Sequence, residues 1–489
     1  MKYEVTIGLE IHAELNTRTK MFCGSPNNPD EKRPNVNVCP ICMGHPGTLP
    51  VINKEAVKKV LAVGRALGGK LADRSRFDRK NYFYPDLPKG YQISQYEYPL
   101  VSGGELLGVK ITRVHLEEDT GKLVHGEDGS LVDFNRAGLP LMELVTEPDI
   151  KSGEEARKFA EELRLVFLYL GVSEANMEKG QMRVEANISL LPQSQISNLK
   201  SQKLGTKVEV KNLNSFRAVE RAINYEIERQ AKLLDAGEKI IQETRGWNEN
   251  KQETFSQREK EESHDYRYFP EPDLPSLEIG SLNLETAIPE LPKQKRERFK
   301  KEYGLGEEQT EIFIRDKGLA GYFEKIAGKL TLLGIECPNE ELFSLAANYL
   351  VTDLRNLMKG GDKSKGADGG PSRAFENLPV SPEDFAKLVG MIKKGEVTSR
   401  AGKDILKIMA EKGGDPSAIA EESGLRQTSD ETEIDKLADE IIAENPEEAD
   451  KYRNGKETLL QFLVGQGMKK TKGSAHPKVL EKALEKKLK

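Results

Sequence analysis

The chain has 489 residues, of which 37% are hydrophobic and 31% charged, and its formal net charge is −6. This length is more than one ordinary domain needs, and the composition suits a globular protein with substantial cores. The acidic balance excludes a protein that holds nucleic acid through a basic field of the whole molecule, so any such contact must come from local patches.

Residues 1 to about 290 are predicted to form mainly strands joined by turns. The first strand is the clearest, because apolar residues alternate there with polar residues or glycine. Its apolar positions are Val5, Ile7, Leu9 and Ile11, which gives one apolar and one polar face. Further strands are expected over 183–189 and 207–211, and helices over 54–67, 152–170 and 215–236, the second with Ser152 as its N-cap. Strands and helices without a regular strand–helix–strand repeat indicate an α+β domain.

The segment 288–292, Ile-Pro-Glu-Leu-Pro, is predicted to be a linker, and the chain beyond it to be helical. We expect a helical domain over 291–398, with a mobile tract of few apolar residues at 359–373. Residues 399–489 show short helical periods separated by turns, which predicts a small helical tail domain. The tail ends in a basic segment, Lys469–Lys489, that holds eight lysines against two glutamates.

The sequence gives no sign of export or of a membrane span. The first residues lack the apolar core of a signal peptide, and no apolar run approaches the ~18 residues that a membrane span needs. We therefore expect a cytoplasmic protein that does not cross a membrane.

The first strand carries candidate metal ligands on its polar face. Glu10, His12 and Glu14 point to one side at intervals of about 7 Å, close enough to converge on one cation. The alternative is the ordinary solvated face of an antiparallel sheet, where charged residues are common.

A second charged run, His115-Leu-Glu-Glu-Asp119, follows an apolar stretch. If this strand continues regularly, Glu118 shares the side of Val114 and Leu116, and Glu117 lies on the other side. A carboxylate among apolar neighbours needs a partner, most simply a cation or an arginine. If the strand instead ends at Leu116, these acids belong to a turn.

Other predicted strands of this domain add further charged and polar residues. Carboxylates with one imidazole suit a hard cation such as Mg²⁺, and arginine or lysine suits phosphate. Together these groups favour phosphoryl transfer, in which catalysis is mostly positioning and charge neutralisation. The residues are Glu147, Asp149, Arg183, Glu185, Glu209, Lys211 and Asn214.

Two segments combine aromatic residues with basic ones. Residues 77–86, Phe-Asp-Arg-Lys-Asn-Tyr-Phe-Tyr-Pro-Asp, and residues 265–273 would suit an anionic planar ligand such as a nucleotide or the end of a tRNA. The alternative is an edge strand with packed aromatic side chains.

Three of the four cysteines fall within the first 42 residues. Cys39-Pro-Ile-Cys42 has the knuckle spacing of a structural zinc site, which Cys23 and His45 could complete. The alternatives are a degraded zinc site or buried free thiols. Cys337 stands alone and is predicted to be a core thiol.

Taken together, these motifs resemble one known family, the B subunits of tRNA-dependent aspartyl/glutamyl amidotransferases. The similarity covers essentially the whole chain, in order. It is carried by Ile7–Glu14, Phe77–Asp86, His115–Asp119, Phe134–Leu141, Val210–Ser215, Asp265–Pro270 and Phe462–Met468. The departure is at Ser25, where many members have a cysteine, and this argues against an all-cysteine zinc site.

The resemblance implies a cradle domain with the catalytic site over 1–290, a helical domain over 291–398, and a YqeY-like tail over 399–489 that binds tRNA. It also implies a heterotrimer with an amidase A subunit, which releases ammonia, and a small C subunit that braces the other two. The chain itself would use ATP and Mg²⁺ to phosphorylate the side-chain carboxylate of Glu on tRNA(Gln) or Asp on tRNA(Asn). Ammonia would then replace the phosphate and give the amide.

The resemblance also implies roles for particular residues, carried over position by position. The catalytic Mg²⁺ ligands would be Glu10, His12 and Glu118. The same cluster or a second ion would be served by Glu147, Glu185 and Glu209. Phosphate or the acceptor end would be contacted by Lys80, Arg183, Lys211 and Asn214, with Lys80 in the catalytic set.

Two functions of other classes stay open at the level of sequence. A non-catalytic tRNA-binding adaptor would need the basic tail and the aromatic segments but not the carboxylates. A self-contained glutamine amidotransferase would need an activated nucleophile, such as cysteine with histidine or the Ser-Lys arrangement of amidases. The clustering of the N-terminal cysteines and the lack of a glycine- and serine-rich amidase stretch disfavour the second function.

Overall fold

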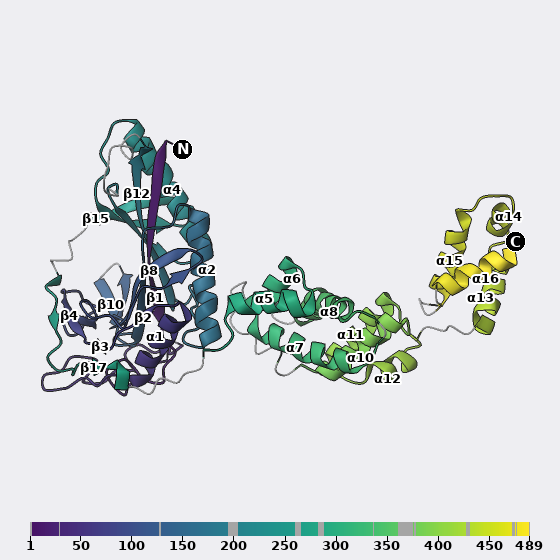
Figure 1. Ribbon diagram of the computed structural model, residues 1–489, viewed down its shortest axis with the longest axis horizontal. Helices are drawn as coiled ribbons and strands as arrows, with labels where there is room; N and C mark the ends of the chain where they lie inside the picture. The colour runs from purple at the N-terminus through teal and green to yellow at the C-terminus, as the bar shows by residue number, and fades with distance from the viewer. Residues whose placement is uncertain are drawn as a thin grey trace. The chain divides into compact units, whose positions relative to one another are not determined.

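In a computed structural model, the chain forms two compact units, Met1–Pro292 and Lys293–Lys489 (Figure 1). The structure describes residues 2–28, 30–126, 129–193, 204–259, 266–281, 288–335, 337–359, 375, 378–426, 431–471, 475 and 477–488.

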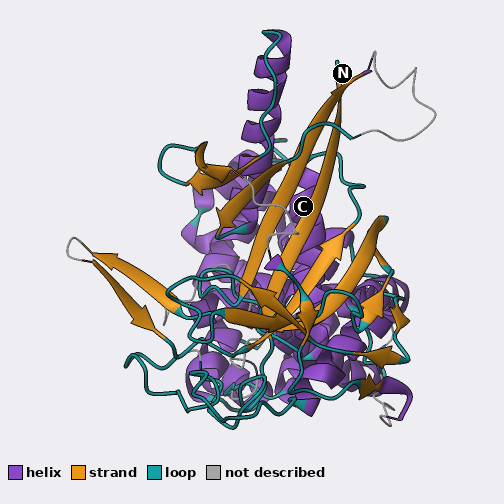
Figure 2. Ribbon diagram, turned by 90° about the vertical axis from the view of Figure 1, so that its left-hand side faces the viewer, coloured by secondary structure: helices purple, strands orange, loops and turns teal. Residues whose placement is uncertain are grey.

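A large mixed sheet is the centre of the first unit, and Figure 2 shows its long strands side by side. The strand order is β15 (Glu253–Glu259), β14 (Glu243–Asn248), β13 (Val208–Leu213), β12 (Met182–Pro192), β1 (Tyr3–Glu14), β11 (Pro140–Thr146), β8 (Val109–Glu118), β6 (Val101–Ser102) and β2 (Lys70–Leu71). A further strand, β7 (Glu105–Leu106), pairs with β8 beside this path. β13 and β14 run parallel, whereas β1 pairs antiparallel with both of its neighbours.

Smaller sheets flank the large one. β16 (Phe269–Pro270), β4 (Asp78–Asn81) and β5 (Tyr91–Ser94) form a three-stranded sheet. β9 (Lys122–Gly126) and β10 (Gly129–Asp133) form a hairpin, and β17 (Leu277–Glu278) pairs with β3 (Arg74–Ser75). The hairpin connects β8 to β11, two central strands of the large sheet.

One face of the large sheet is apolar and is covered by helices. The alternation of β1 buries its apolar residues, and Leu9 and Ile11 are each 1% exposed. The covering helices are α1 (Lys54–Ala66), α2 (Gly153–Leu170) and α4 (Phe216–Asp235), and Figure 1 shows α2 and α4 along one side of the strands. Ser152 accepts a hydrogen bond from the backbone N–H of Glu155 and so caps α2, as predicted. The opposite face carries the polar residues of β1, among them the half-buried Glu10 and His12.

The second unit is helical, with a short 3-10 helix (Ile279–Ser281) preceding it in the first unit. One core lies among α5 (Pro292–Tyr303), α6 (Glu307–Arg315), α7 (Lys317–Leu332), α8 (Asn339–Asn348), a π-helical turn (Tyr349–Leu354), α9 (Arg355–Lys359), α10 (Pro382–Lys394), α11 (Ser399–Lys412) and α12 (Pro416–Glu422). A separate core lies among α13 (Glu431–Glu444), α14 (Pro446–Arg453), α15 (Leu459–Lys470) and α16 (Pro477–Leu488).

The α+β class predicted from the sequence is confirmed. β8 runs through Glu118, so the alternative in which the strand ends at Leu116 is wrong. The predicted mobile tract at 359–373 lies outside the described residues apart from its first residue, and the three-domain division stays a prediction. Among the described residues, no helix has the length and apolar character needed to cross a membrane.

Candidate active site and cation-binding groups

The polar face of the large sheet gathers charged side chains from neighbouring strands. In an antiparallel pair, directly opposed residues point to the same face. His12 on β1 lies opposite Glu143 on β11 and Arg183 on β12. Glu10, two residues earlier on β1, lies opposite Glu185 on β12. The alternation of β1 and the register of its neighbours therefore place acids, a histidine and an arginine on one surface.

Three charged residues of this face form a compact set that we call the His12 group: His12 on β1, Glu117 on β8 and Glu143 on β11. Their ligand atoms lie within 4.8 Å of one another. His12 Nε2 lies 3.5 Å from Glu117 Oε1 and 3.3 Å from Glu143 Oε2. Both glutamates are buried. One imidazole nitrogen and two carboxylate oxygens at these separations fit a hard divalent cation bound between them.

The pKa values in the His12 group report a surplus of negative charge. Burial alone would lower the pKa of His12, but Glu143 and Glu117 outweigh it and raise the pKa to about 9. Burial alone would raise the pKa of Glu143, but His115 and His12 hold it well below its usual range. The buried His115 places Nε2 3.3 Å from Glu143 Oε2 and so orients that carboxylate. The group needs a positive charge, whether a proton on the imidazole or a metal ion.

A second set on the same face, the Glu10 group, consists of Glu10, Glu185 and Glu209. Carboxylate oxygens of these three residues lie within 4.8 Å of one another. Lys211 Nζ lies 2.7 Å from Glu185 Oε2 and 3.8 Å from Glu209 Oε2. Burial alone would lower the pKa of Lys211, but Glu185 and Glu209 raise it above its usual value.

Two neutral side chains hold the carboxylates of the Glu10 group. Asn187 Nδ2 donates to Glu10 Oε1 at 2.8 Å, and Thr244 Oγ1 donates to Glu209 Oε2 at 2.7 Å. Along β1, Glu10 and His12 are about 7 Å apart, as alternate residues of a strand are. The two groups are therefore adjacent, and together they could hold one or two divalent cations.

Lys80 on β4 adds a positive charge beside the His12 group. Burial alone would lower the pKa of Lys80, but the Glu117 carboxylate helps raise it far above its usual value. Lys80 Nζ lies 4.9 Å from the centre of the Tyr266 ring, which packs edge-on against Tyr82 and Tyr268. The ammonium thus lies between carboxylates and an aromatic wall, where an anionic ligand could meet it.

Arg183 belongs to an ion-pair network next to His12. Arg183 Nη2 lies 2.8 Å from Asp119 Oδ1, and Arg136 Nη2 lies 2.5 Å from Asp119 Oδ2 and 3.2 Å from Glu14 Oε1. Burial alone would raise the pKa of Asp119, but the two guanidiniums hold it well below its usual range. Burial and the Asp119 charge raise the pKa of Glu14 to about 7.

Glu118 lies on the opposite face of the sheet from the His12 group, because successive residues of β8 alternate. Its carboxylate accepts hydrogen bonds from Lys89 Nζ at 2.6 Å and from the backbone N–H of Ile93 at 2.9 Å. The partner expected for this buried carboxylate is therefore a lysine. The expectation that Glu118 shares a cation with Glu10 and His12 requires correction, since Glu117 occupies that position.

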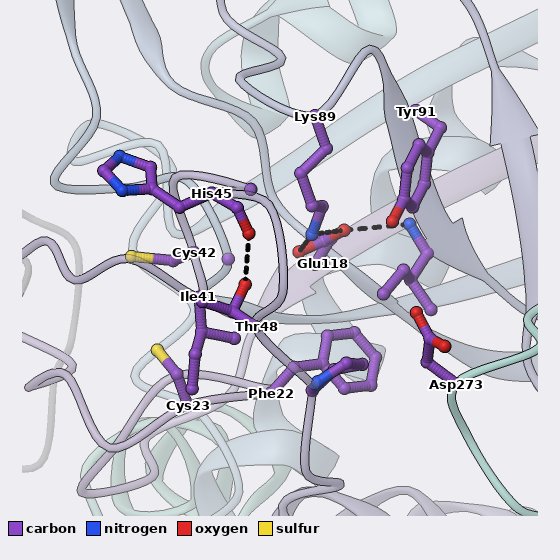
Figure 3. A pocket seen from close by; sticks show the side chains of 14 residues that line it. Phe22, Cys23, Ile41, Cys42, His45, Thr48, Lys89, Tyr91, Glu118 and Asp273 are labelled. Atoms are coloured by element: carbon purple, nitrogen blue, oxygen red, sulfur yellow. Dashed lines mark hydrogen bonds and ion pairs between the residues drawn. The ribbon is translucent and has the colours of Figure 1, made fainter.

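Lys89 and Glu118 line a pocket of about 110 Å³ that also borders the segment around Cys42 and His45. Figure 3 shows Lys89 reaching the Glu118 carboxylate beside Tyr91, with the cysteine segment across the pocket. This pocket belongs to the cysteine side of the sheet and not to the His12 group.

Two other residues expected at the site lie outside both groups. Glu147 follows the end of β11 and accepts a hydrogen bond from Thr112 Oγ1 at 2.7 Å. Asn214 is exposed, and its Nδ2 donates to Asn212 Oδ1 at 3.3 Å.

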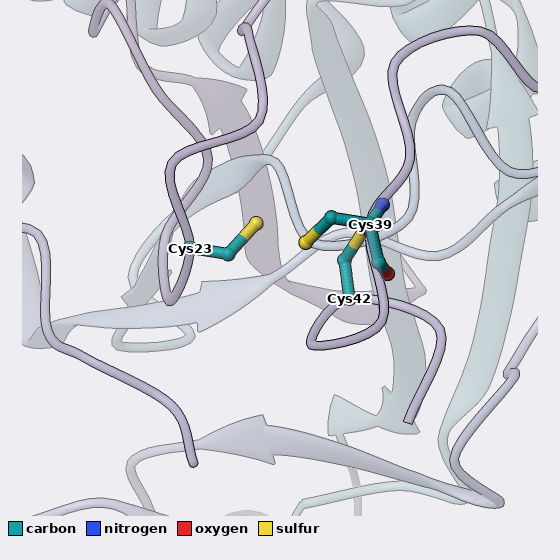
Figure 4. A group of neighbouring side chains, drawn as sticks. All are labelled: Cys23, Cys39 and Cys42. Carbon is teal, nitrogen blue, oxygen red and sulfur yellow. Dashed lines mark hydrogen bonds between the residues drawn. The ribbon is translucent and has the colours of Figure 1, made fainter. Parts of the chain in front are cut away.

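The structure brings Cys23, Cys39 and Cys42 together, with their Sγ atoms within 4.8 Å of one another (Figure 4). The turn between Cys39 and Cys42 lets the backbone N–H of Cys39 donate to Cys42 Sγ at 3.2 Å. His45 is exposed and is not part of this set. Three sulfurs at these separations fit a thiolate-rich metal site whose fourth ligand comes from elsewhere.

A buried lysine supports the cysteine set. Lys20 is 1% exposed, and its Nζ lies 3.8 Å from Cys42 Sγ. It also donates to the backbone oxygens of Ala137 at 2.7 Å and Phe134 at 3.2 Å. The ammonium would offset the charge of metal-bound thiolates and ties the cysteine segment to the loop that carries Arg136.

Known proteins match both units of the chain. A family model described as the GatB/GatE catalytic domain matches residues 5–285, and one described as the GatB domain matches residues 371–488. The chain is 45% identical over 500 residues to the B subunit of the aspartyl/glutamyl-tRNA(Asn/Gln) amidotransferase of Persephonella marina, with 100% of both chains covered. The protein of the same name from Rippkaea orientalis is 44% identical over 511 residues, with 100% of this chain and 98% of the relative covered.

The chain belongs to the family of amidotransferase B subunits.

Membership of this family confirms the resemblance carried by the sequence motifs. The name of its members describes one chain of a multi-subunit amidotransferase that acts on tRNA. The catalytic-domain model covers the sheet with the His12 group, the Glu10 group and the three clustered cysteines.

Two members of the His12 group, Glu117 and Glu143, are absent from the residues expected from sequence. The alternation of side chains along the strand could have identified Glu117, because Glu117 and His115 are two residues apart and lie on the same face. Glu143 is the one charged residue in the apolar segment 140–146, which is a signal for a buried carboxylate with a specific partner. No sequence pattern identifies Lys89 as the partner of Glu118. Lys89 lies in a loop, and the position of a loop cannot be predicted from hydrophobic periodicity.

Proposed function

We propose that this chain is the carboxylate-activating subunit of a tRNA-dependent amidotransferase. It phosphorylates the side-chain carboxylate of Glu on tRNA(Gln), of Asp on tRNA(Asn), or of both, and ammonia then replaces the phosphate. The observation that carries this proposal is the convergence of His12, Glu117 and Glu143 on one sheet face, in a chain of the amidotransferase family.

The chemistry explains why a phosphoryl donor is needed. A carboxylate is a poor acyl donor because its leaving group would be oxide. Attack of a carboxylate oxygen on the terminal phosphorus of ATP forms an acyl phosphate and releases ADP. Ammonia then attacks the carbonyl carbon and loses a proton as the carbon–nitrogen bond forms, and the bond to the phosphate oxygen breaks. Bound Mg²⁺ would neutralise charge between the anionic reactants.

Different residues of the polar face would have different roles in this reaction. His12, Glu117 and Glu143 would hold Mg²⁺, and His115 keeps the Glu143 carboxylate in position. The Glu10 group would hold a second cation or share the first. Lys80 presents its ammonium to phosphate beside the aromatic wall, where water has limited access.

The partners follow from the need for ammonia and for a charged tRNA. The chain would assemble with an amidase A subunit, which releases ammonia from glutamine or asparagine, and with a small C subunit. The helical tail would contact the tRNA, and the protein would work in the cytoplasm, where aminoacyl-tRNA is made and used. The name of the Persephonella marina relative, which makes it one subunit of an enzyme, supports assembly with other chains.

For the cysteine set we propose structural zinc. Three thiolate ligands would come from Cys23, Cys39 and Cys42. The fourth ligand of the tetrahedral zinc ion would be a water molecule, or His45 after rotation of its side chain. Such a site would fix the segment 23–42 against the large sheet without taking part in the reaction.

The test is a complex reconstituted from this chain and its partner subunits. With ATP, Mg²⁺ and glutamine, it should release ADP only when misacylated tRNA is present, and should yield the amide. Running Glu-tRNA(Gln) and Asp-tRNA(Asn) in parallel identifies the substrate. If tRNA binds but neither substrate elicits ADP, the chain is a non-catalytic tRNA-binding adaptor and the proposal is wrong.

A further inference from the structure

Lys211 places a positive charge inside the Glu10 group. It lies on β13 two residues after Glu209, so both side chains leave the strand on the same face. The ammonium donates to Glu185 Oε2 at 2.7 Å and lies 3.8 Å from Glu209 Oε2. One ammonium offsets only part of the charge of three carboxylates, so the group still attracts cations.

A divalent cation and the Lys211 ammonium compete for the same carboxylates. Glu185 accepts the lysine hydrogen bond, and it is also one of the three glutamates whose oxygens lie close enough to ligate one ion. A metal ion bound by Glu185 would lie near the ammonium, and like charges repel strongly where water is partly excluded. The carboxylates of the His12 group accept no comparable lysine hydrogen bond within the described ranges.

We propose that Lys211 is an internal counter-cation that keeps metal out of the Glu10 group until nucleotide binds. This inference rests on the proposed function, since it takes the Glu10 group as a second cation site of the phosphoryl-transfer centre. The phosphates of ATP supply oxygen ligands to the metal and a new anionic partner to the ammonium that leaves Glu185. Metal and nucleotide therefore enter this group together, whereas the His12 group takes up metal without nucleotide.

The experiment counts bound Mn²⁺ by electron paramagnetic resonance on the full-length chain. Wild type should gain a second Mn²⁺ only with a non-hydrolysable ATP analogue. Lys211→Met removes the charge and keeps a long side chain, so it should gain the second Mn²⁺ without nucleotide, with an apparent Kd lowered by about tenfold or more. Lys211→Arg retains the charge and should keep the nucleotide dependence.

A matched control is Lys158→Met. Lys158 Nζ pairs with Glu154 at 2.7 Å, and both side chains are more than half exposed. This variant loses the same charge from the same unit and should bind Mn²⁺ as wild type does.

Two results separate failure of this inference from failure of the proposed function. If wild type gains its second Mn²⁺ with nucleotide and Lys211→Met binds no more Mn²⁺ than wild type without it, the counter-cation role is wrong. If wild type gains no second Mn²⁺ and Glu209→Gln leaves the count unchanged, the Glu10 group is no cation site, and that part of the proposed function fails. Should Lys211→Met not fold, Lys211→Gln replaces it under the same criteria.

Discussion

Glu117 and Glu118 are neighbours in sequence, but their side chains lie on opposite faces of the sheet and contact different residues. Glu117 faces His12 and Glu143 on the polar side of the sheet, with its Oε1 3.5 Å from His12 Nε2. Glu118 faces the cysteine side, where Lys89 neutralises it within hydrogen-bond distance. Because Glu118 already has a cation in contact and Glu117 lies beside His12, Glu117 is the residue that we propose as a ligand of a metal ion at His12.

This difference predicts opposite outcomes for two conservative variants. Glu117→Gln should weaken Mn²⁺ binding at the His12 group by about tenfold or more, because it removes a charged ligand. Glu118→Gln should leave Mn²⁺ binding unchanged but lower the free energy of unfolding by about 1 to 3 kcal/mol, because the half-buried Lys89 ammonium loses its counter-charge. Mn²⁺ titration and denaturant unfolding of both variants check this. Loss of Mn²⁺ in Glu118→Gln alone would reverse the assignment.

At the scale of elements, local sequence signals predict the ends of helices better than the contacts of strands. The helices α2 and α4 begin and end within one residue of the predicted ranges 152–170 and 215–236, and Ser152 and Ser215 cap them. The alternation of β1 identifies Glu10 and His12 as residues of one face. The partner strands could not be predicted, because register depends on contacts between distant segments. Glu143 joins His12 only through the pairing of β1 with β11.

We expect the segment that carries Cys23, Cys39 and Cys42 to hold zinc. The purified chain should contain about one zinc ion, and Cys39→Ser should lose it and unfold at a lower temperature, because a structural zinc site contributes directly to folding. Elemental analysis and thermal unfolding provide the measurements. Cys337→Ser is the control, since Cys337 packs against the core of the second unit and should not alter the zinc content. Protein that is purified without chelator and contains no zinc would overturn the proposal.

At the scale of the whole molecule, the second unit contains two separate hydrophobic cores. The residues of α13 to α16 bury their apolar side chains among themselves, and α11 and α12 contribute to the other core of the second unit. The tail that the sequence predicts from residue 399 therefore includes helices that pack against the preceding ones, and a cut at that position would expose their core.

This arrangement predicts the effect of a truncation placed after Arg426. The shortened chain should fold, because the removed residues have their own core. Its affinity for tRNA should fall by about tenfold or more, and the wild-type affinity should fall with added salt, if the lysines of the tail contact phosphates as proposed. Filter binding at two salt concentrations measures both effects. Unchanged affinity after the truncation would place the tRNA contact elsewhere.

We propose that the His12 group activates the carboxylate before ammonia arrives. The most direct measurement is amidation by the complex that carries His12→Ala, with glutamine and with ammonium as separate nitrogen donors. We expect the rate to fall by orders of magnitude with both donors, because loss of a metal ligand removes several kcal/mol of charge stabilisation from the phosphorylation step. Assembly with the other subunits should persist. Amidation restored by ammonium would contradict a role of His12 in activation and would assign His12 to the supply of ammonia.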